Sequence, residues 1–394
     1  MSLDVRSKSA GAGLALIFIM GAIITVFGTI RSAYEHQLQA VSGGSFAISF
    51  IGGQHEPSIT ARAAVLVEAN TGTVLFGKSQ HEVRELASIT KVMTAIVALE
   101  RGDLADTVTV SRRAAQVPGS SLGLAPGQQL KLEELIRGMM LRSGNDGATA
   151  IAEHIGGSVE AFVGLMNARA RSMGLRNTRF ANPHGLSAPG HYSTAHDIAV
   201  MCMRGLAVPK FAQIVGCTEL WASQLEGESV KGSTLVYNTN KLLWSYEGAD
   251  GVKTGTTTAA GHCLAASASR DGLQFISVVL KSSSRFRDSA VLLDYGFNNF
   301  KRKDIAEAGE EIACALVDGG ATPTVGMATA QTVQVVVRAN QEDMLKAVVD
   351  CPDKPQAPVR VGQHLGWLRL VQGEEELQAF PLFAMDNVKP KWGF

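Results

Sequence analysis

A serine and a lysine three positions apart are the first residues in the sequence that could do chemistry together. Ser88 and Lys91 form an S-x-x-K pattern at the start of an apolar stripe. Residues three apart lie on one face of a helix, so the Lys91 amine can reach the Ser88 hydroxyl. A serine hydroxyl is a poor nucleophile until a base takes its proton, and a lysine can do so only if burial or nearby cations depress its pKa. The pair indicates a nucleophilic site, although taken alone it also fits a helix N-cap serine beside a solvated lysine.

A second motif, Ser143-Gly144-Asn145, lies between two expected helices, where a tripeptide of this kind also serves as a turn or cap. A third, Lys253-Thr254-Gly255 followed by Thr256, lies on an expected strand. A second cationic amine would help to keep Lys91 neutral, Thr254 offers a hydroxyl to a carboxylate, and Gly255 permits close backbone approach. In this order the three motifs match the set S-x-x-K, S-[DG]-N and K-T-G of penicillin-binding proteins and serine β-lactamases.

The elements that must position these motifs can be read from the apolar periodicity. Residues 88–101 carry a stripe of period 3.6 and are expected to form a core-facing helix. The same pattern returns at 131–141, 147–155 and 159–173, so a helical cluster is expected over roughly 90–210. Strand patterns occur as a hairpin at 61–75 and as a meander at 251–256, 261–269 and 273–281, followed by a helix at 288–297. A mixed α/β domain is predicted, with one antiparallel sheet assembled from both ends of its sequence.

Residues 301–394 have a different texture, with short alternating stretches separated by Gly, Pro and Asp clusters. This pattern predicts a small all-β sandwich, and it contains no catalytic constellation. The expected organisation is therefore an N-terminal membrane anchor or signal segment at 1–40, a linker at 41–60, a catalytic domain at 61–300 and the sandwich at 301–394.

The N-terminus indicates the compartment. Residues 11–30 carry no charge over 20 positions, which corresponds to roughly 30 Å of helix, about one hydrocarbon thickness. Arg6 and Lys8 precede this run, so the positive-inside rule places everything after it outside the cytoplasm. The apolar run is longer than the usual core of a signal peptide, so we expect an uncleaved anchor. Ala40-Val41-Ser42 resembles a signal-peptidase site, so a secreted protein is the alternative. The expected location is the extracytoplasmic face of the bacterial cell membrane.

Composition excludes several other classes of protein. The 36 basic and 36 acidic side chains give a formal charge of zero, which offers no basic face to a nucleic acid. Five cysteines without a C-x-x-C pair argue against a disulfide scaffold or a structural zinc site. His184 and His191 lack the spacing of metal ligands, so they are interpreted as cleft-lining histidines, and Cys263 as a small buried hydrophobe. No metal and no cofactor are expected.

The similarity extends well beyond the motifs. Several stretches between residues 60 and 300 resemble the D-alanyl-D-alanine carboxypeptidases among the low-molecular-mass penicillin-binding proteins, and 301–394 is similar to the C-terminal β-sandwich of that family. They are VRELASITKVMTAIVALE, GSSLGLAPGQQLKLEELIRGMMLRSGNDGATAIAEHIGG, RNTRFANPHGLSAPGHYSTAHDIAVM, NTNKLLW, GADGVKTGTTTAAGHCLAASA and SSRFRDSAVLLDYGF. The resemblance implies a serine β-lactamase/transpeptidase-like catalytic domain. The chain lacks the C-terminal amphipathic anchor helix of several relatives, so the N-terminal segment is expected to replace it.

The resemblance also implies the reaction and its participants. Ser88 would attack the carbonyl between two D-alanines of a peptidoglycan stem peptide, with Lys91 as base, and the enzyme would be acylated and inhibited by β-lactams. The N–H groups of Ser88 and Thr256 would form the oxyanion hole, and Ser143 would relay a proton to the departing D-alanine. Asn145 would hold the stem-peptide amide. The terminal carboxylate would be bound by Lys253, Thr254 and Arg285.

Three alternative functions remain open. A class A β-lactamase would share the motifs but needs a glutamate-activated water, and no E-x-x-L-N pattern occurs in residues 146–252. A membrane-anchored β-lactam sensor would need a cytoplasmic effector, yet only ten residues precede the apolar run. A catalytically idle wall-binding protein would have no use for the intact nucleophile set. The expected partners are therefore the stem peptide, β-lactams and, through the N-terminal segment, the membrane, with no nucleic acid.

Overall fold

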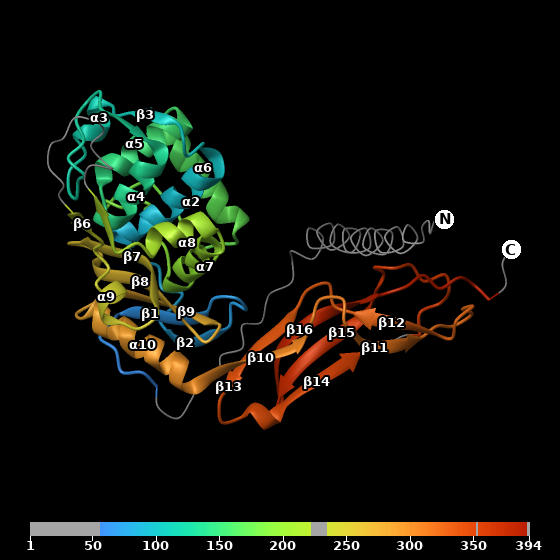
Figure 1. Ribbon diagram of the computed structural model, residues 1–394. Coiled ribbons are helices and arrows are strands. Elements are labelled where there is room, and N and C mark those ends of the chain that lie inside the picture. Colours follow the sequence, from blue (N-terminus) through green and yellow to red (C-terminus); the bar gives the residue numbers. More distant parts are fainter. Residues whose placement is uncertain (1–55, 222–234, 352–353, 392–394) are drawn as a thin grey trace, which may run out of the picture. The chain divides into compact units, whose positions relative to one another are not determined.

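The computed structural model describes residues 56–221, 235–351 and 354–391 (Figure 1). They form two compact units, one ending at Phe300 and the other beginning at Lys301. The apolar segment at 11–30, the cleavage-type site at 40–42 and most of the linker expected at 41–60 lie outside the described residues. Within the described ranges, no single helix is long and apolar enough to cross a membrane. One helix pair bent by 111°, Ala195–Leu206 with Pro209–Val215, meets the length and composition criteria only jointly.

The first unit is built on a five-stranded antiparallel sheet (Figure 1). The N-terminal hairpin supplies two strands and residues 249–282 supply three, so both ends of the unit's sequence meet in one sheet, as expected. Ala63 lies opposite Leu280 where the two groups join. In spatial order the strands are β2 (Val74–Lys78), β1 (Ala63–Glu68), β9 (Leu273–Ser282), β8 (Gly261–Arg270) and β7 (Ala249–Thr257).

Both faces of this sheet are covered, which is why its central strands are nearly continuous apolar runs. Val278 faces the main core, together with its same-face neighbours Ile276 and Leu280. On the opposite face, the ring of Phe275 meets that of Phe297 edge-on at 4.8 Å between centroids. Phe297 belongs to helix α10 (Arg285–Asn299), which packs on β8 and β9. The sheet therefore forms the middle layer of this unit.

The remaining helices form the expected cluster between β2 and β7 in the sequence (Figure 1). They are α2 (Lys91–Arg101), α3 (Arg112–Ala115), α4 (Leu132–Arg142), α5 (Asn145–Gly156), α6 (Val159–Ser172), α7 (Ala195–Leu206), α8 (Pro209–Val215) and α9 (Leu242–Ser245). Two short hairpins complete the unit: β3 (Thr107–Thr109) with β4 (Gln129–Lys131), and β5 (Glu219–Trp221) with β6 (Leu235–Tyr237). α7 packs on β1 and β9 and so joins the cluster to the sheet.

The helix expected over 88–101 divides into two parts. Residues Ala87–Thr90 form a 3-10 turn, η1, and α2 begins only at Lys91. Ala87 has φ 48°, a left-handed conformation that is strained for a residue with a Cβ atom. The apolar stripe did not reveal this change, because a 3-10 turn and an α-helix place residues three apart on similar faces. Ser88 therefore lies in the 3-10 turn, three residues before the first α-helical residue, Lys91.

The second unit is an all-β sandwich, as the alternating pattern predicted. Its larger sheet has the order β11 (Glu311–Leu316), β12 (Thr324–Ala328), β16 (Glu375–Ala384), β15 (His364–Gln372) and β14 (Leu345–Asp350). The smaller sheet pairs β10 (Phe300–Ala306) with β13 (Val333–Arg338), and a 3-10 turn, η4 (Glu342–Met344), precedes β14. Alternate residues such as Leu368 and Leu370 of β15 are buried, whereas Trp367 and Arg369, which alternate with them, are exposed.

Candidate active site

The Lys91 amine lies at the centre of the site. Its Nζ atom is 3.0 Å from Ser88 Oγ, 2.7 Å from Asn145 Oδ1 and 2.7 Å from the His184 carbonyl oxygen. An uncharged amine has two N–H donors and one lone pair. It can therefore donate to the amide and carbonyl oxygens while its lone pair accepts the Ser88 hydroxyl proton. A charged ammonium would instead donate to all three oxygens, so it is the depressed pKa of Lys91 that favours the neutral base.

Burial controls the charge of the two lysines in the site. The Lys91 side chain is fully buried, and burial and then the nearby Lys253 lower its pKa well below the ordinary value, against an opposing effect of Asp146. Burial and Arg285 lower the pKa of Lys253 to about 7. Lys253 Nζ has no hydrogen-bond partner among the described residues. Lys91 is thus biased towards the uncharged base. Lys253 changes between its charged and neutral forms near pH 7, and an incoming anion would stabilise the charged form.

Asn145, the first residue of α5, is held by both ends of its amide. Its Nδ2 donates to the Pro118 carbonyl at 2.7 Å, which turns Oδ1 towards Lys91. The Asn145 backbone N–H also donates to the Ser120 carbonyl at 2.7 Å. These bonds tie the 118–120 loop to the start of α5, so the orientation of the amide follows from its partners.

The neighbouring Asp146 was not singled out from the sequence, yet it fastens the same loop. Its buried carboxylate accepts from the backbone N–H groups of Leu122, Gly123 and Leu124 and from the Ser121 hydroxyl. Four N–H groups, counting that of Gly147, and one hydroxyl compensate the burial of a carboxylate. No sequence signal marks this role, because an aspartate near a helix start is also an ordinary first-turn residue.

Strand β7, which carries the Lys253-Thr254-Gly255 motif, comes closest to η1, the 3-10 turn of Ser88, at Gly255. A Cβ atom at this position would lie 2.8 Å from the Leu86 carbonyl oxygen and 3.2 Å from the Ser88 nitrogen. Only glycine permits this approach without displacing one of the two backbones. β7 is also an outer strand of its sheet, paired with β8 on one side. Its other edge is accordingly placed beside Ser88, where an extended peptide could add as a further strand.

Hydroxyls and a guanidinium line the outer part of β7. Thr254 Oγ1 lies 2.7 Å from Thr239 Oγ1. Arg285, the first residue of α10, donates from Nη1 to Thr256 Oγ1 at 2.8 Å and to the Gly255 carbonyl at 3.0 Å. Two threonine hydroxyls and the Lys253 amine of β7 thus lie with the Arg285 guanidinium that reaches this strand from α10, a donor set that suits a carboxylate.

A further network behind Ser88 was not assigned from the sequence. Thr90 Oγ1 donates to the Ala87 carbonyl at 2.7 Å, and His191 Nδ1 accepts from the Ala181 N–H at 3.0 Å. Gly185 packs against the same turn, because a Cβ atom there would come within 1.9 Å of the Ala87 carbonyl oxygen. The loop at 181–191 therefore supports η1 from behind. His191 is buried rather than lining the cleft, and burial lowers its pKa to about 4.

Ser143 ends α4 in the left-handed conformation, with φ 67°. Its side chain is nearly buried. The chain reverses here, so that Asn145 two residues later faces Lys91. The structure thus brings Ser88, Lys91 and Asn145 into direct contact, with β7 packed on η1 beside them.

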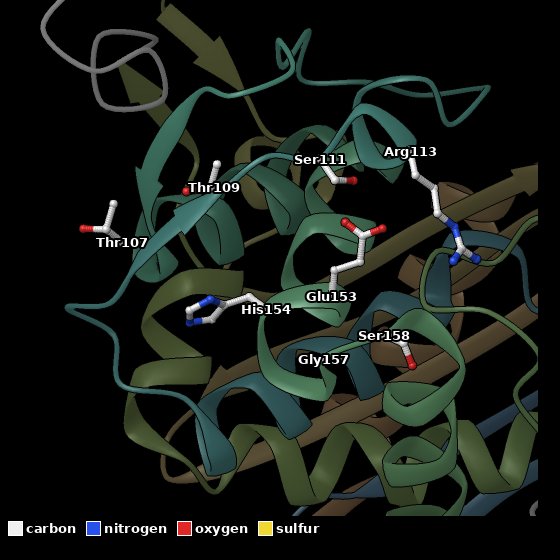
Figure 2. Close-up of a pocket in the computed structure, with 8 residues that line it drawn as sticks. All are labelled: Thr107, Thr109, Ser111, Arg113, Glu153, His154, Gly157 and Ser158. Carbon is white, nitrogen blue, oxygen red and sulfur yellow. The ribbon is translucent and has the colours of Figure 1, made fainter.

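The other titratable groups offer no competing centre. His184 contributes its backbone carbonyl to Lys91, and burial lowers the pKa of its imidazole to about 3. Within the described residues, no three His, Cys, Asp or Glu side chains are grouped as metal ligands. A hollow of about 480 Å³ lies near the end of α5. Figure 2 shows Glu153 and His154 among the side chains that line it. Asn145 begins that helix, about 12–14 Å from Glu153 and His154 along the helix axis at 1.5 Å per residue.

Comparison with known families identifies both units. Residues 52–284 match the model of the D-alanyl-D-alanine carboxypeptidase family, and residues 300–390 match that of the penicillin-binding protein 5 C-terminal domain. The D-alanyl-D-alanine carboxypeptidase DacF of Bacillus subtilis is 36% identical, covering 85% of this chain and 87% of that protein. DacC of Escherichia coli, which carries the same enzyme name, is 35% identical over 84% of this chain and 85% of that protein.

Solved structures agree with these matches. Penicillin-binding protein 5 from Haemophilus influenzae superposes with a TM-score of 0.79 at 30% identity, covering 86% of this chain and 100% of that chain. A D-alanyl-D-alanine carboxypeptidase from Mycobacterium tuberculosis superposes with a TM-score of 0.59 at 32% identity, covering 63% of this chain and 95% of that one. The first unit therefore has the transpeptidase fold of the penicillin-binding proteins, and the predicted resemblance is confirmed. The comparisons lend no support to a β-lactamase, a sensor or an idle scaffold. The chain belongs to the D-alanyl-D-alanine carboxypeptidases, the serine peptidases of the low-molecular-mass penicillin-binding proteins.

Proposed function

We propose that this protein removes the terminal D-alanine from peptidoglycan stem pentapeptides through an acyl-enzyme on Ser88. The observation that carries the proposal is the 3.0 Å contact between Ser88 Oγ and Lys91 Nζ. Burial and the neighbouring Lys253 depress the pKa of that lysine. A hydroxyl and a base of this kind form an activated nucleophile.

In the acylation step, Lys91 takes the proton of Ser88 as Oγ attacks the carbonyl between the two D-alanines. The N–H groups of Ser88, near the start of η1, and of Thr256, on the outer strand β7, stabilise the developing oxyanion. The amide bond breaks, and Ser143 passes a proton to the departing amine of D-alanine. Water then hydrolyses the ester and restores the Ser88 hydroxyl.

Substrate binding uses the edge of β7. The stem peptide adds alongside this strand in an extended conformation, and Asn145 holds its amide. The terminal carboxylate binds to Lys253, Thr254 and Arg285, which lie on β7 or reach it from α10. A bound carboxylate stabilises the charged form of Lys253, so substrate binding and the protonation of this lysine favour each other.

A β-lactam enters the same reaction as an analogue of the D-alanyl-D-alanine bond. Its ring opens but stays attached after Ser88 attacks, so the leaving group cannot depart and the adduct persists. Residues 11–30 would hold the protein to the extracytoplasmic face of the cell membrane, because the segment is uncharged and long enough to span a bilayer.

Mass spectrometry of a pentapeptide ending in D-Ala-D-Ala, incubated with the full chain in detergent, tests this proposal. Release of one D-alanine by the wild type and none by Ser88→Ala is the expected result. The same variant should lose covalent labelling by a fluorescent penicillin while its circular dichroism stays unchanged. Undiminished labelling of Ser88→Ala would place the nucleophile elsewhere.

A further inference from the structure

A hollow outside the catalytic motifs lies at the opposite end of α5 from Asn145. Its volume of about 480 Å³ falls within the range of about 300–1,000 Å³ that small-molecule sites occupy. Figure 2 shows Thr107 and Thr109 of β3 on one wall and Glu153 and His154 of α5 on another. We call it the α5 hollow and define it by its lining residues: Thr107, Thr109, Ser111, Arg113, Glu153, His154, Gly157 and Ser158.

Four hydroxyls line the α5 hollow, and each accepts a hydrogen bond from the protein. The hydroxyl oxygens of Thr107 and Thr109 accept from side chains of β4, at 3.1 and 3.4 Å. Those of Ser111 and Ser158 accept from backbone N–H groups in the first turns of α3 and α6, at 2.9 and 3.1 Å. A hydroxyl has one hydrogen and two lone pairs, so all four can still donate to a ligand and accept from it.

The charges around the α5 hollow carry no positive surplus. Arg113 is paired with Glu160 at 2.8 Å, and His154 Nε2 lies 3.1 Å from an Asp106 carboxylate oxygen. The hydrogen bond to Glu160 and, to a smaller extent, the charge of Glu153 raise the pKa of Arg113. Three carboxylates thus face one guanidinium and one imidazole. Such a lining repels anions and suits a neutral ligand that is rich in hydroxyl and amide groups.

A short segment joins the α5 hollow to the catalytic site. The chain runs from Arg113 to the loop at 118–120, whose carbonyls accept from the Asn145 side chain and backbone. Burial is the main cause of the low pKa of His184, and the charge of Arg113 contributes to it. The His184 carbonyl in turn accepts from Lys91. The hollow is therefore a neighbour of the cleft on its helical side.

The direction and length of the substrate lead to the α5 hollow. In the proposed function, Arg285 binds the terminal carboxylate on the side of the sheet, whereas Asn145 holds an amide of the stem. The rest of the stem accordingly runs past Asn145, away from the sheet. Four stem residues precede the scissile bond and span about 13–14 Å when extended. Glu153 and His154 lie about 12–14 Å from Asn145 along the axis of α5, which is the same reach.

We propose that the α5 hollow binds the glycan strand, through hydroxyl and acetamido groups of the amino sugar that carries the stem peptide. The lactyl carboxyl group of that sugar is bound in the amide to the first stem residue, so the sugar is neutral. A stem peptide still attached to its glycan is then a better substrate than a free peptide, which uses the cleft alone. This inference rests on the proposed function, from which it takes the direction of the bound peptide.

Two substrates with the same scissile bond test the α5 hollow in the full chain. The wild type should cleave a disaccharide pentapeptide with a kcat/KM at least about fivefold higher than that for the free pentapeptide. Glu153→Ala/Thr109→Ala removes a carboxylate and a hydroxyl from the two walls. The ratio should fall to about one, through a higher KM for the disaccharide substrate. The kcat/KM for the free pentapeptide should stay within about twofold, because neither residue touches the reacting atoms.

Glu247→Ala/Thr324→Ala is the matched control, because it removes the same two types of side chain at exposed positions outside the hollow. This variant should keep the ratio of the wild type. Thermal unfolding of both double variants checks that each keeps its fold. A ratio of about one in the wild type, or an undiminished ratio in Glu153→Ala/Thr109→Ala, would overturn the inference.

Binding of a neutral probe separates this inference from the proposed function. The probe is the disaccharide with L-alanine amide on its lactyl group, which lacks the scissile bond. Calorimetric titration of Ser88→Ala should show binding that weakens at least about fivefold on adding Glu153→Ala/Thr109→Ala. The affinity should be similar at about 0.1 M and 1 M salt, because salt screens interactions between charges. Absence of binding, or a steep salt dependence, would overturn the inference. Release of D-alanine by Ser88→Ala would instead overturn the nucleophile assignment.

Discussion

His191 Nε2 lies 2.8 Å from Thr90 Oγ1, in the same 3-10 turn as Ser88. Because His191 Nδ1 accepts from the Ala181 N–H, the single proton of the neutral ring is on Nε2 and is donated to Thr90. Thr90 in turn donates to the Ala87 carbonyl, beside the residue with the left-handed φ. The imidazole therefore acts on the nucleophile through the turn and touches none of the proposed reacting atoms.

Replacing the Thr90 hydroxyl tests this positioning role. Thr90→Val keeps the shape of the side chain but removes both hydrogen bonds, so Ala87 and Ser88 should relax. A net hydrogen bond is worth about 0.5–1.5 kcal/mol, so we expect penicillin acylation to slow roughly 3- to 10-fold. Stopped-flow labelling measures the rate, and Thr90→Ser, which retains the hydroxyl, should stay near the wild type. Equal acylation rates for Thr90→Val and Thr90→Ser would show that the hydrogen bonds of Thr90 do not affect the reaction.

The motifs could be predicted from the sequence because each is local. Ser88 and Lys91 are one turn apart, and Lys253 and Gly255 lie on one strand, so the spacing alone determines their mutual placement. The strands were predictable for a similar reason, since both faces of the sheet are buried and the apolar runs are continuous. The 3-10 geometry of η1 was not predictable, because the stripe of apolar residues is compatible with either helix.

The supporting network could not be predicted, because its members are distant in the sequence. Thr90 and His191 are 101 positions apart, and no spacing rule connects them. Asp146 and Gly185 act through backbone groups of other loops, which any sequence can supply. Gly185 has a left-handed backbone, and a glycine in a loop is a sequence signal of such a turn. The signal does not reveal that this loop packs against η1 at Ala87.

Lys91→Ala should slow acylation by at least about 100-fold, in line with typical contributions of a general base. The matched comparison is Lys91→Arg, which supplies a cation but no base, since a guanidinium stays protonated. Both variants should therefore be slow in a fluorescent-penicillin assay, at every pH up to about 10. A near-wild-type rate in Lys91→Arg would show that the charge, and not proton transfer, is what the site requires.

The pH dependence of kcat/KM should report Lys253. Its pKa is about 7 in the free protein, so it is charged below that pH and neutral above it. Because the cation attracts the terminal carboxylate, kcat/KM for the pentapeptide should fall as the pH rises through about 7. An arginine stays charged, so in Lys253→Arg the fall in kcat/KM should occur at a pH higher by two or more units. If kcat/KM of Lys253→Arg still fell at about pH 7, the titrating group would be another residue.

Arg285→Ala should discriminate between substrates by their C-terminus. The guanidinium is proposed to bind the terminal carboxylate, so turnover of the free acid should fall more than that of the C-terminal amide. A charge-assisted hydrogen bond is worth about 1.5–3 kcal/mol, which corresponds to roughly 10- to 150-fold. Parallel assays of the two peptides measure the ratio, and an equal loss for both would contradict carboxylate recognition by this residue.

Gly255→Ala places a Cβ atom 2.8 Å from the Leu86 carbonyl oxygen, so β7 or the nucleophile turn must move. Because the contacts are with backbone, a side-chain rotation cannot relieve them, and acylation should fall by at least about tenfold. Gly164→Ala is the matched control: nothing lies within 4 Å of its added Cβ, and alanine is about 1 kcal/mol better than glycine in a helix. Thermal unfolding of both variants separates activity from stability. A Gly255→Ala protein that acylates at the wild-type rate would show that the spacing between β7 and Ser88 is not what limits the reaction.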